Sequence, residues 1–587
     1  MQSGKKPEYG SDLIVDLMKR YGFKYAALNP GSSFRALHDS IVNYGGNEIP
    51  KIVLCCHEEI AVAVAHGYAR ASGEPMIAIC HDLVGLQHAS MAIYNAWIDR
   101  APIIVLGATG PSDPTGEKPF PRLAPLHTAH LQGELVRDYV KWDYQPNSLP
   151  GVMESFARAY KIALTEPTGP VYLCYDAMLQ EEALGEIPAI DPSENFPPSC
   201  APSGNPDKLR ETVERILTAK NPVLITGMVG RQKETWRSLV SFAEILGLPV
   251  VDQGLRFNIP NSHPLTVTGA EKEILREADL VVALDVLDLY WALTRLSDRH
   301  EHLLNPEAKI IRIGLEDYTI RSWSEARRLV VTDLSIIADS AIALREMEQI
   351  AKRLLARDEK ARKGIEGRGA SIRMRHQQIR DRWKKKAEKQ WEDNPVSLPR
   401  LLLELKDLLG SHPWSLVNAG TPASVWARRL WEFEEPDQFC AGNPGGGLGH
   451  GIGASIGAAL SEPLSGRICI NLQPDGDLLY TLSGLWTVSH LKIPLLTIMT
   501  NNRSYYNDEE HAEHLAIRRN RPVENKVVGF RIDPPATDFA KIAQGFQIYA
   551  EGPIEDPKLL RGSLERALKV VKENRLPALV DVITQPR

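Results

Sequence analysis

The sequence has few cysteines, and none are spaced as metal ligands or disulfide partners usually are. Seven cysteines are scattered over 587 residues, and the single adjacent pair, Cys55 and Cys56, lies in an apolar run that looks like a strand. Zinc sites and disulfide frameworks need CxxC pairs or His/Cys clusters, which are missing here. We therefore expect reduced cysteines with structural roles.

Long apolar runs and a basic excess are missing too. No segment approaches the roughly 18 apolar residues of a membrane span, and the N-terminus lacks the apolar stretch of a signal peptide. These absences predict a soluble, cytoplasmic protein without a membrane partner. The formal net charge of −6 argues against nucleic acid as a partner and favours a small-molecule ligand.

The pattern of apolar runs predicts an α/β protein with three doubly wound, mostly parallel-sheet domains, because strand-like and helix-like segments alternate. In the first domain the expected strands are 25–30, 51–56, 76–80 and 102–108, with helices at 59–72 and 89–98. The Rossmann-like middle domain has expected strands at 222–227, 248–253, 279–285, 309–314 and 328–333. We place the domains at 1–190, 200–345 and 395–587, with a charged helical linker at 346–394.

Two distant stretches, 76–108 and 467–500, share one layout of strand, loop, helix, proline and strand. The shared layout suggests two related domains. Only the first domain has acidic residues at a helix entry, Glu58 and Glu59, and only the last has Asp475 with Asn501-Asn502. Two unlike halves of this kind could face each other around one ligand.

Polar residues end two neighbouring strands of the last domain. Asp475-Gly476 follows one strand, and Asn501-Asn502 follows the next. Ligands bind at the carboxyl edge of open parallel sheets, and a helix N-terminus there offers N–H groups to phosphate. Magnesium prefers carboxylate, amide and phosphate oxygens, so Asp475 and Asn502 are candidate ligands. Taken singly, each motif has a more common structural explanation, Asp-Gly as a tight turn and Asn-Asn as a strand cap.

Asp-Gly followed some 27 residues later by Asn-Asn (502 − 475) resembles the signature of enzymes that depend on thiamine diphosphate (ThDP) and Mg²⁺. The resemblance implies that Asp475, Asn502 and the Ser504 carbonyl bind the metal. Pro474 stands where the family usually has glycine, so its effect on the turn is open. The glycine-rich stretch 443–460 also fits: the resemblance implies that Leu448 holds ThDP bent and that the Gly446 carbonyl binds its amino group, although helix packing would explain these glycines as well. The full set of implied cofactor contacts is Glu58, Thr421, Gly446, Leu448, Asp475, Gly476, Asp477, Asn502, Ser504 and Tyr505.

Glu58 is the predicted activating residue. ThDP becomes reactive when a buried carboxyl group stabilises an imino form of its aminopyrimidine. Glu58 stands between an apolar strand and an apolar helix, nine residues before Gly67-Tyr68 (67 − 58), as in the family. An isolated Glu58-Glu59 pair could instead interact with the helix dipole. In the family this glutamate and the diphosphate site belong to different subunits, which implies a homodimer or homotetramer.

The substrate side of the site is predicted from three polar positions. Ser32, in Asn-Pro-Gly-Ser-Ser, and His81 are similar to benzoylformate decarboxylase, in which the matching residues contact substrate and relay protons. Asp508, six residues past Asn502, falls where pyruvate decarboxylase has a catalytic glutamate. A turn, a backbone-bonded histidine and an exposed helix start are the structural alternatives for these three positions. His127 and His130 could also reach the site.

Four activities share these residues. The first is decarboxylation of a 2-oxo acid through a ThDP enamine, a lyase reaction, and the second is carboligation of the acetolactate synthase type, a transferase reaction. The third is lysis of a 2-hydroxyacyl-CoA or oxalyl-CoA, and the fourth is ThDP binding by an inactive regulatory paralogue. Acetolactate synthases also bind FAD in the middle domain; segment 268–295 lacks their Gly-rich, Arg-bearing turns, so FAD is not favoured. The sequence leaves the substrate open, and Glu58 argues against an inactive paralogue because binding alone would not need it.

Overall fold

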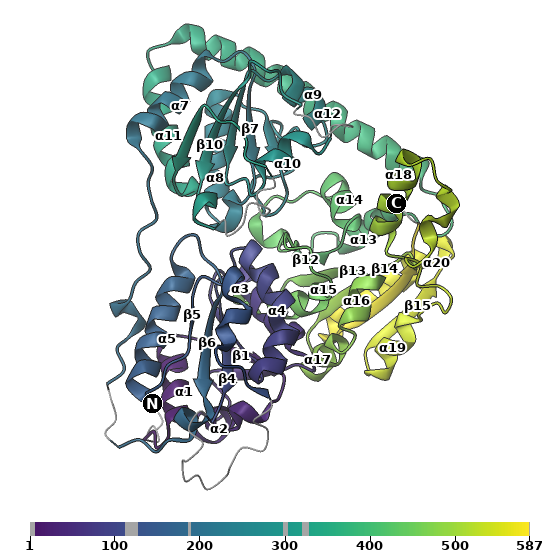
Figure 1. Cartoon of the computed structure of the whole chain (residues 1–587). Coiled ribbons are helices and arrows are strands. Elements are labelled where there is room, and N and C mark those ends of the chain that lie inside the picture. Colours follow the sequence, from purple (N-terminus) through teal and green to yellow (C-terminus); the bar gives the residue numbers. More distant parts are fainter. Residues whose placement is uncertain (1–5, 112–126, 186–188, 297–302, 320–327, 586–587) are drawn as a thin grey trace. The chain divides into compact units, whose positions relative to one another are not determined.

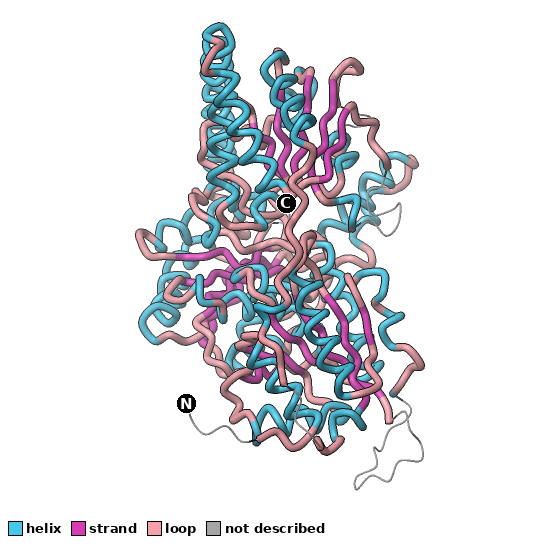
Figure 2. The backbone as a smooth tube through the Cα atoms, turned by 90° about the vertical axis from the view of Figure 1, so that its left-hand side faces the viewer, coloured by secondary structure: helices cyan, strands magenta, loops and turns pink. Residues whose placement is uncertain are grey.

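The computed structural model describes residues 6–111, 127–185, 189–296, 303–319 and 328–585. The chain forms two compact units. The first contains residues 1–199, 392–424 and 443–587, and the second contains residues 200–391 and 425–442. The predicted α/β class with three parallel-sheet domains is confirmed, because each of three sheets consists of parallel strands flanked by helices (Figures 1 and 2).

The N-terminal sheet of the first unit has six strands in the order β2-β1-β3-β4-β6-β5. Its strands are β1 (Tyr25–Leu28), β2 (Lys51–Leu54), β3 (Met76–Ile79), β4 (Ile103–Thr109), β5 (Asp143–Tyr144) and β6 (Val171–Asp176). Its helices are α1 (Gly10–Arg20), α2 (Arg35–Asp39), α3 (Glu58–Ser72), α4 (Asp82–Ile98), α5 (Leu149–Leu164) and α6 (Ala177–Glu181). Residues of β3 and β4 are fully buried, as expected for strands covered on both faces.

The C-terminal sheet of the same unit has five strands in the order β12-β13-β14-β16-β15. Its strands are β12 (Trp414–Ala419), β13 (Ile468–Pro474), β14 (Leu495–Asn501), β15 (Tyr549–Ile554) and β16 (Ala578–Ile583). The accompanying helices are α13 (Leu398–Leu409), α14 (Ala423–Leu430), α15 (His450–Leu460), α16 (Asp475–Tyr480), α17 (Gly484–His490), α18 (Tyr506–Arg518), α19 (Phe539–Gly545) and α20 (Pro557–Lys569). Strands β13 and β14 pair in register from Cys469 with Leu495 to Pro474 with Thr500, so both end at the same edge.

Helices α3 and α15 join the two sheets of the first unit at very short range. A Cβ atom on Gly67 would lie 2.1 Å from the Ala454 carbonyl oxygen, and one on Gly457 would lie 1.9 Å from the Val64 carbonyl oxygen. These distances leave no room for a side chain, so small residues on both helices allow their backbones to touch. This packing brings the start of α3, where Glu58 stands, to the start of α15.

The second unit contains a sheet in the order β11-β10-β9-β7-β8. Its strands are β7 (Pro222–Thr226), β8 (Val250–Asp252), β9 (Leu280–Leu284), β10 (Lys309–Gly314) and β11 (Leu334–Ile337). Its helices are α7 (Pro206–Thr218), α8 (Thr235–Leu246), α9 (Glu271–Glu277), α10 (Leu289–Thr294), α11 (Ser340–Leu355) and α12 (Glu359–Lys389). This unit has its own apolar core, formed by the inner faces of these elements.

One predicted strand is wrong. The apolar run at 328–333 was expected to be a strand, but Leu329 and Val331 are 88% and 90% exposed, and the last strand of the middle sheet is the next segment, β11. Composition does not distinguish which of two adjacent apolar runs forms the strand. In the structure the second run, β11, pairs with β10.

Helices α11 and α12 confirm the helical character expected after residue 340, and their contacts place them in the second unit. The His376 imidazole Nδ1 lies 2.8 Å from the Thr266 carbonyl oxygen, and Arg368 Nε donates to the Gly247 carbonyl oxygen at 3.0 Å. The helix therefore packs on the middle domain. The domain boundaries stay a prediction.

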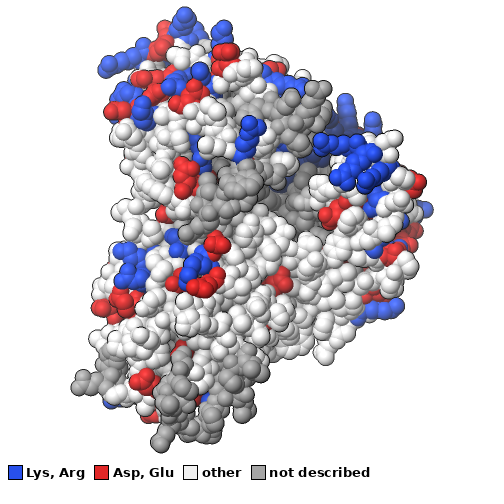
Figure 3. All heavy atoms as spheres, viewed as in Figure 1, with Lys and Arg blue, Asp and Glu red and all other residues white. Residues whose placement is uncertain are grey.

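The described surface matches the composition. Within the described ranges, no helix is both long and apolar enough to cross a membrane. On the face shown in Figure 3, acidic and basic side chains are interspersed, with wide uncharged areas between them.

Candidate active site

The two predicted metal ligands lie at the ends of neighbouring strands. Asp475 follows β13, and Asn502 follows β14. The Asp475 side chain is buried, and burial raises its pKa to about 6, against the opposing effect of backbone N–H groups such as that of Gly476. Among the described residues, its Oδ2 atom has no hydrogen-bond partner. A buried carboxylate oxygen without a partner is costly unless a cation or donor binds it.

The neighbouring asparagines differ in what they bind. Asn501 is buried and committed to the fold: its Nδ2 donates to Asp581 Oδ1 at 3.1 Å. Asn502 is half-buried, and its Oδ1 accepts from the Ser504 N–H at 3.0 Å. Because an amide oxygen has two lone pairs, Asn502 Oδ1 can accept that bond and still bind a metal.

Pro474 is accommodated by a glycine. A Cβ atom on Gly420 would lie 2.1 Å from Pro474 Cγ, so Pro474 rests on the bare backbone of the turn after β12. Pro474 ends β13 with an extended backbone, φ −68° and ψ 145°, which proline adopts without strain. The departure at 474 therefore leaves Asp475 at the strand end.

Asp477 organises a loop. Its carboxylate accepts from the Gly449 N–H at 2.9 Å, the Gly451 N–H at 3.3 Å and Gln473 Nε2 at 2.6 Å. Burial raises the pKa of Asp477, and these donors oppose that rise. Both carboxylate oxygens are thus engaged by the start of α15 and by Gln473. The predicted cofactor contact at 477 remains untested, and the structure gives Asp477 a role in holding the glycine-rich loop.

The glycine-rich loop alternates buried and exposed residues. Gly447 is buried, whereas its neighbours Gly446 and Leu448 are exposed, Leu448 by 39%. Gly446 has φ +73°, in the left-handed region that favours glycine. Thr421, in the turn after β12, is exposed as well. Exposure leaves all three predicted cofactor contacts accessible to a ligand.

The residues after Asn502 cover the edge of the sheet at which Asp475 and Asn502 lie. The Tyr505 ring lies against Gly476, where a Cβ atom would be 2.5 Å from Tyr505 Cε1. Asp508 is exposed on the first turn of α18, whereas the next residue, Glu509, is 2% exposed and bonded to the Ser504 hydroxyl. The buried acid of this helix therefore holds the Ser504 segment. The predicted catalytic role of Asp508 stays untested.

Glu58 begins α3 and is 3% exposed. The His88 Nδ1 atom, from α4, lies 3.2 Å from Glu58 Oε2. The ring of His88 stacks on that of His57 at 4.7 Å and 20°, and His57 caps α3 by accepting from the Glu59 N–H at 3.2 Å. Stacked rings do not direct their nitrogen atoms to one point, and His57 Nδ1 is already occupied. We therefore interpret this cluster as a support for Glu58.

His81 precedes α4 in a second cluster. Its Nδ1 atom lies 2.8 Å from Ser33 Oγ, and its Nε2 atom lies 3.4 Å from His127 Nδ1. Ser33 is 1% exposed and also accepts from the Asp82 N–H at 3.3 Å. Ser32, the predicted substrate contact, is exposed, as is His130. The structure thus brings Ser33 and His127 to His81.

Gly85 shows that Glu58 and His81 are neighbours. A Cβ atom on this α4 residue would lie 2.8 Å from Glu58 Oε1 and 3.1 Å from His81 Cβ. Glycine is therefore needed where both side chains approach the helix. The Glu58 carboxyl group and the His81 side chain therefore lie close together at the carboxyl edge of the N-terminal sheet.

The donors fit the implied cofactor. Asp475 offers a free carboxylate oxygen and Asn502 an amide oxygen, both hard ligands of the kind that Mg²⁺ binds. Glu58 is a buried carboxyl group whose Oε1 atom approaches α4 at Gly85, where a side chain would collide with it. These residues could hold a diphosphate through Mg²⁺ and an aminopyrimidine, respectively.

Family models match most of the chain. The N-terminal TPP binding domain of thiamine pyrophosphate enzymes matches residues 9–139, the central domain matches 209–347, and the C-terminal TPP binding domain matches 419–582. The chain belongs to the thiamine pyrophosphate enzyme family. Thiamine pyrophosphate is another name for ThDP, so the resemblance seen in the sequence is confirmed.

The chain is similar to curated proteins with two different activities. It is 23% identical over 613 residues to a probable acetolactate synthase large subunit of Methanocaldococcus jannaschii, covering 98% of this chain and 92% of that one. It is 24% identical over 592 residues to benzoylformate decarboxylase of Pseudomonas aeruginosa, covering 97% and 98%. Among solved structures, benzoylformate decarboxylase of Polynucleobacter necessarius aligns with a TM-score of 0.76 at 20% identity, covering 98% of each chain. The relatives thus include both a synthase and a decarboxylase.

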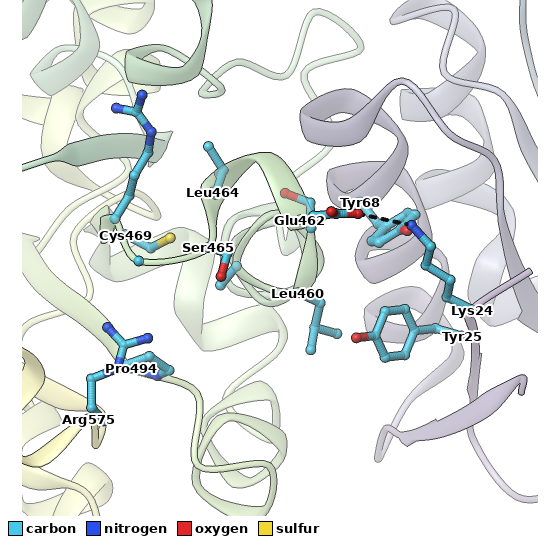
Figure 4. A pocket seen from close by; sticks show the side chains of 14 residues that line it. Lys24, Tyr25, Tyr68, Leu460, Glu462, Leu464, Ser465, Cys469, Pro494 and Arg575 are labelled. Carbon is cyan, nitrogen blue, oxygen red and sulfur yellow. Dashed lines mark hydrogen bonds and ion pairs between the residues drawn. The ribbon is translucent and has the colours of Figure 1, made fainter. Parts of the chain in front are cut away.

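A separate cavity of about 380 Å³ lies at the opposite edge of the first unit's sheets, where strands begin. Figure 4 shows Lys24 and Tyr25 on one side of it and Pro494 with Arg575 on the other. Lys24 pairs with Glu74 at 3.0 Å and with Glu462 at 3.4 Å. None of the predicted site residues lines this cavity. Because ligands of parallel sheets bind at carboxyl ends, we do not assign the reaction to it.

Sequence reasoning missed Ser33, His88 and Asn95, whose contacts are tertiary. A signal existed for the last two: His81, Gly85, His88, Met91 and Asn95 recur at intervals of four, three, three and four residues. That spacing places them on one face of α4, the face that meets Glu58 and the glycine-rich loop.

Proposed function

We propose that this enzyme cleaves a C–C bond next to a carbonyl group with ThDP and Mg²⁺, and that its reaction is decarboxylation of a 2-oxo acid. The observation on which the proposal rests is the meeting of buried Glu58 with His81 at Gly85. The 24% identical benzoylformate decarboxylase agrees with this choice.

In this proposal the C-terminal domain binds the diphosphate end of the cofactor, and the N-terminal domain binds its aminopyrimidine. Asp475 and Asn502 hold Mg²⁺ and, through it, the diphosphate, with the Ser504 carbonyl as the third protein ligand. Bound ThDP would supply a nucleophilic carbon and take up the electrons of the cleaved bond. Glu58 exchanges a proton with the aminopyrimidine nitrogen, and its burial keeps water from competing for that hydrogen bond.

His81 is the proposed acid and base for the substrate. Ser33 fixes its Nδ1 atom, which leaves Nε2, beside His127, to give or accept a proton at the reacting carbon or hydroxyl. Ser32 and Asp508 are exposed and could contact the substrate carboxylate or an exchangeable proton. Both roles remain proposals.

The test is CO2 release from a panel of 2-oxo acids with ThDP and Mg²⁺. Glu58→Gln keeps the size of the side chain but cannot exchange the proton, so kcat should fall by at least roughly 100-fold with the melting temperature unchanged. Glu48→Gln, an exposed change in the same domain, is the control and should retain full kcat. Unchanged turnover in Glu58→Gln would disprove the assignment of Glu58.

Carboligation is the second candidate, because the relatives also include probable acetolactate synthases. The same residues would serve both reactions. Incubation with pyruvate and analysis of the products separates them: free aldehyde with CO2 indicates decarboxylation, whereas acetolactate indicates carboligation.

We further propose that two chains form each site, as a homodimer or a homotetramer. Leu448 and Tyr480 are 39% and 59% exposed, and Met91 is 37% exposed. These apolar side chains surround the glycine-rich loop and would be covered by the cofactor and a second copy of the chain.

A further inference from the structure

Asn95 connects the N-terminal sheet to the glycine-rich loop of the first unit. It lies near the end of α4 and is 0% exposed. Its Oδ1 atom accepts from the Gly447 N–H at 3.1 Å, and its Nδ2 atom donates to the Gly447 carbonyl oxygen at 3.4 Å. Both polar atoms of the Asn95 amide thus bind the backbone of one residue, Gly447, as a residue on a neighbouring strand would bind it.

The loop follows the surface of α4 at close range. A Cβ atom on Gly445 would lie 2.5 Å from Asn95 Oδ1, and one on Gly447 would lie 2.3 Å from Met91 Cε. Two glycines are therefore needed for the loop to reach Asn95. The Gly447 carbonyl accepts a second bond from Asn443 Nδ2 at 2.8 Å, which closes the loop on itself.

The hydrogen bonds that fix Gly447 also fix the orientation of the residues on either side of it. Gly447 is buried against α4, while Gly446 and Leu448, one residue before and after it, are exposed. A loop that is fixed at its middle residue and turned outward on both sides presents a carbonyl group and an apolar side chain in a defined arrangement. These are the two groups that the family resemblance assigns to the aminopyrimidine and to the bend of the cofactor.

We propose that Asn95 is a positioning residue for the cofactor: it holds Gly447 so that Gly446 and Leu448 are preorganised for ThDP. This inference rests on the ThDP dependence of the proposed function and on the contacts that the family resemblance implies for Gly446 and Leu448. Preorganisation lowers the ordering cost that binding would otherwise include, so Asn95 acts on ThDP affinity without touching ThDP.

Helix α4 also connects Asn95 to the region around Glu58. Its first turns contact Glu58 through Gly85 and His88, and its last turns hold the loop through Met91 and Asn95. If Glu58 serves the cofactor of the partner subunit, one rigid helix borders two different active sites. A change at Asn95 should then affect the glycine-rich loop of its own chain more than the position of Glu58.

The experiment compares two equally buried asparagines in the full-length protein. Asn258, in the second unit, is also 0% exposed; it accepts from the Gly230 N–H at 2.8 Å and donates to the Gly227 carbonyl oxygen at 2.9 Å. Asn95→Ala and Asn258→Ala thus each remove two bonds to glycine backbone, and Asn258→Ala also removes the bond from Asn258 Nδ2 to Asp252 Oδ1 at 2.7 Å. Calorimetric titration of the protein with ThDP in excess Mg²⁺ gives Kd, and thermal unfolding with and without ThDP gives the stability and its increase on binding.

We expect Asn95→Ala to weaken ThDP binding by about tenfold or more, as for loss of a buried hydrogen-bond pair, and to reduce the Tm increase caused by ThDP. Asn258→Ala should lower Tm in the absence of ThDP and leave Kd unchanged. Asn95→Asp keeps the acceptor and the size but places a carboxylate oxygen against the Gly447 carbonyl, so it should weaken ThDP binding even if the alanine variant does not fold.

Wild-type Kd in a folded Asn95 variant, or an equal loss of affinity in Asn258→Ala, would overturn the proposal by reducing Asn95 to a structural residue. Failure of the wild-type protein to bind ThDP would overturn it together with the cofactor assignment. Binding of ThDP without CO2 release would instead refute only the proposed reaction, because the affinity comparison does not depend on turnover.

Discussion

At the scale of single residues, neighbours in the sequence have separated roles. Ser32 is exposed, while Ser33 contacts His81; Asn501 is committed to Asp581, while Asn502 is left with a free lone pair. The separation arises because consecutive side chains point in different directions: to opposite faces in a strand such as the one that ends at Asn501, and about 120° apart in the 3-10 turn that begins at Ser32. A sequence motif identifies such a pair of adjacent residues, but it does not indicate which of the two faces the ligand.

The two serines give a direct test. Ser33→Ala removes the group that fixes the His81 ring, so kcat/KM for the best 2-oxo acid should fall by about tenfold, the cost of one lost hydrogen bond of about 1.4 kcal/mol. Ser32→Ala tests the alternative serine in the same assay. If the two variants lose activity in the reverse order, the contact between Ser33 and His81 is not the one that matters for catalysis.

Glu59 predicts a pH dependence of stability. Burial, followed by the nearby carboxylate of Asp477, raises the pKa of Glu59 to about 7 from its usual 4.5, with His88 opposing. The folded state therefore binds more protons than the unfolded state between about pH 4.5 and 7, and this residue lowers stability as pH rises through that window. Urea unfolding of the protein without cofactor at pH 5 and pH 8 should show a smaller decrease in Glu59→Gln than in wild type. Equal decreases would contradict the raised pKa.

At the scale of elements, the site depends on helices that touch without side chains between them. The small-residue runs of α3 and α15 allow backbone contact at Gly67 and Gly457, which places the start of α3 beside the glycine-rich loop. Helix α4 then spans both, with Gly85 at one end and Asn95 at the other. The active-site geometry is therefore set by packing between elements more than by any one loop.

Gly457→Ala tests the contact between α3 and α15. The new Cβ atom would lie 1.9 Å from the Val64 carbonyl oxygen, so the helices must separate, at a cost of roughly 1–3 kcal/mol in the free energy of unfolding. Gly364→Ala is the matched control, because this α12 glycine is exposed with nothing within 4 Å of the added atom. It should gain up to about 1 kcal/mol from helix propensity. Denaturant titration measures the free energy of unfolding of both variants. Equal changes would show that α3 and α15 can accommodate a methyl group at Gly457.

At the scale of the whole molecule, the two related domains of the first unit place complementary groups in one chain. Glu58 stands in one domain, and Asp475 with Asn502 stands in the other. The second unit has its own core and sheet. The family assignment rests on all three domains in this order.

Mixed oligomers test whether the site is shared between chains. Glu58→Gln and Asp475→Asn should each be inactive alone, and co-purified mixtures should regain about one quarter of wild-type activity, because half of random dimers are mixed and each has one intact site. Differently tagged chains allow isolation of the mixed species. Inactive mixtures that contain confirmed mixed dimers would show that each chain completes its own site.

Much of the fold and part of the candidate site could be predicted from sequence. Alternating apolar runs predicted three parallel sheets because parallel strands are buried on both faces. Glu58, Asp475 and Asn502 were proposed because a metal, a diphosphate and a proton transfer each require a particular donor at a strand end. The misplaced strand at 328–333 shows the limit, since two apolar runs compete for one edge and only pairing with β10 selects between them.

The sequence by itself determined the family, the fold class and the candidate site residues, because these depend on residue type and local spacing. Only the tertiary structure decided that Ser33 contacts His81, that Asp477 holds a loop, that Pro474 rests on Gly420 and that Asn95 grips Gly447. Each of these is a contact between residues distant in the chain, or a choice between adjacent ones. Such contacts follow from how helices and sheets pack, which local patterns do not specify.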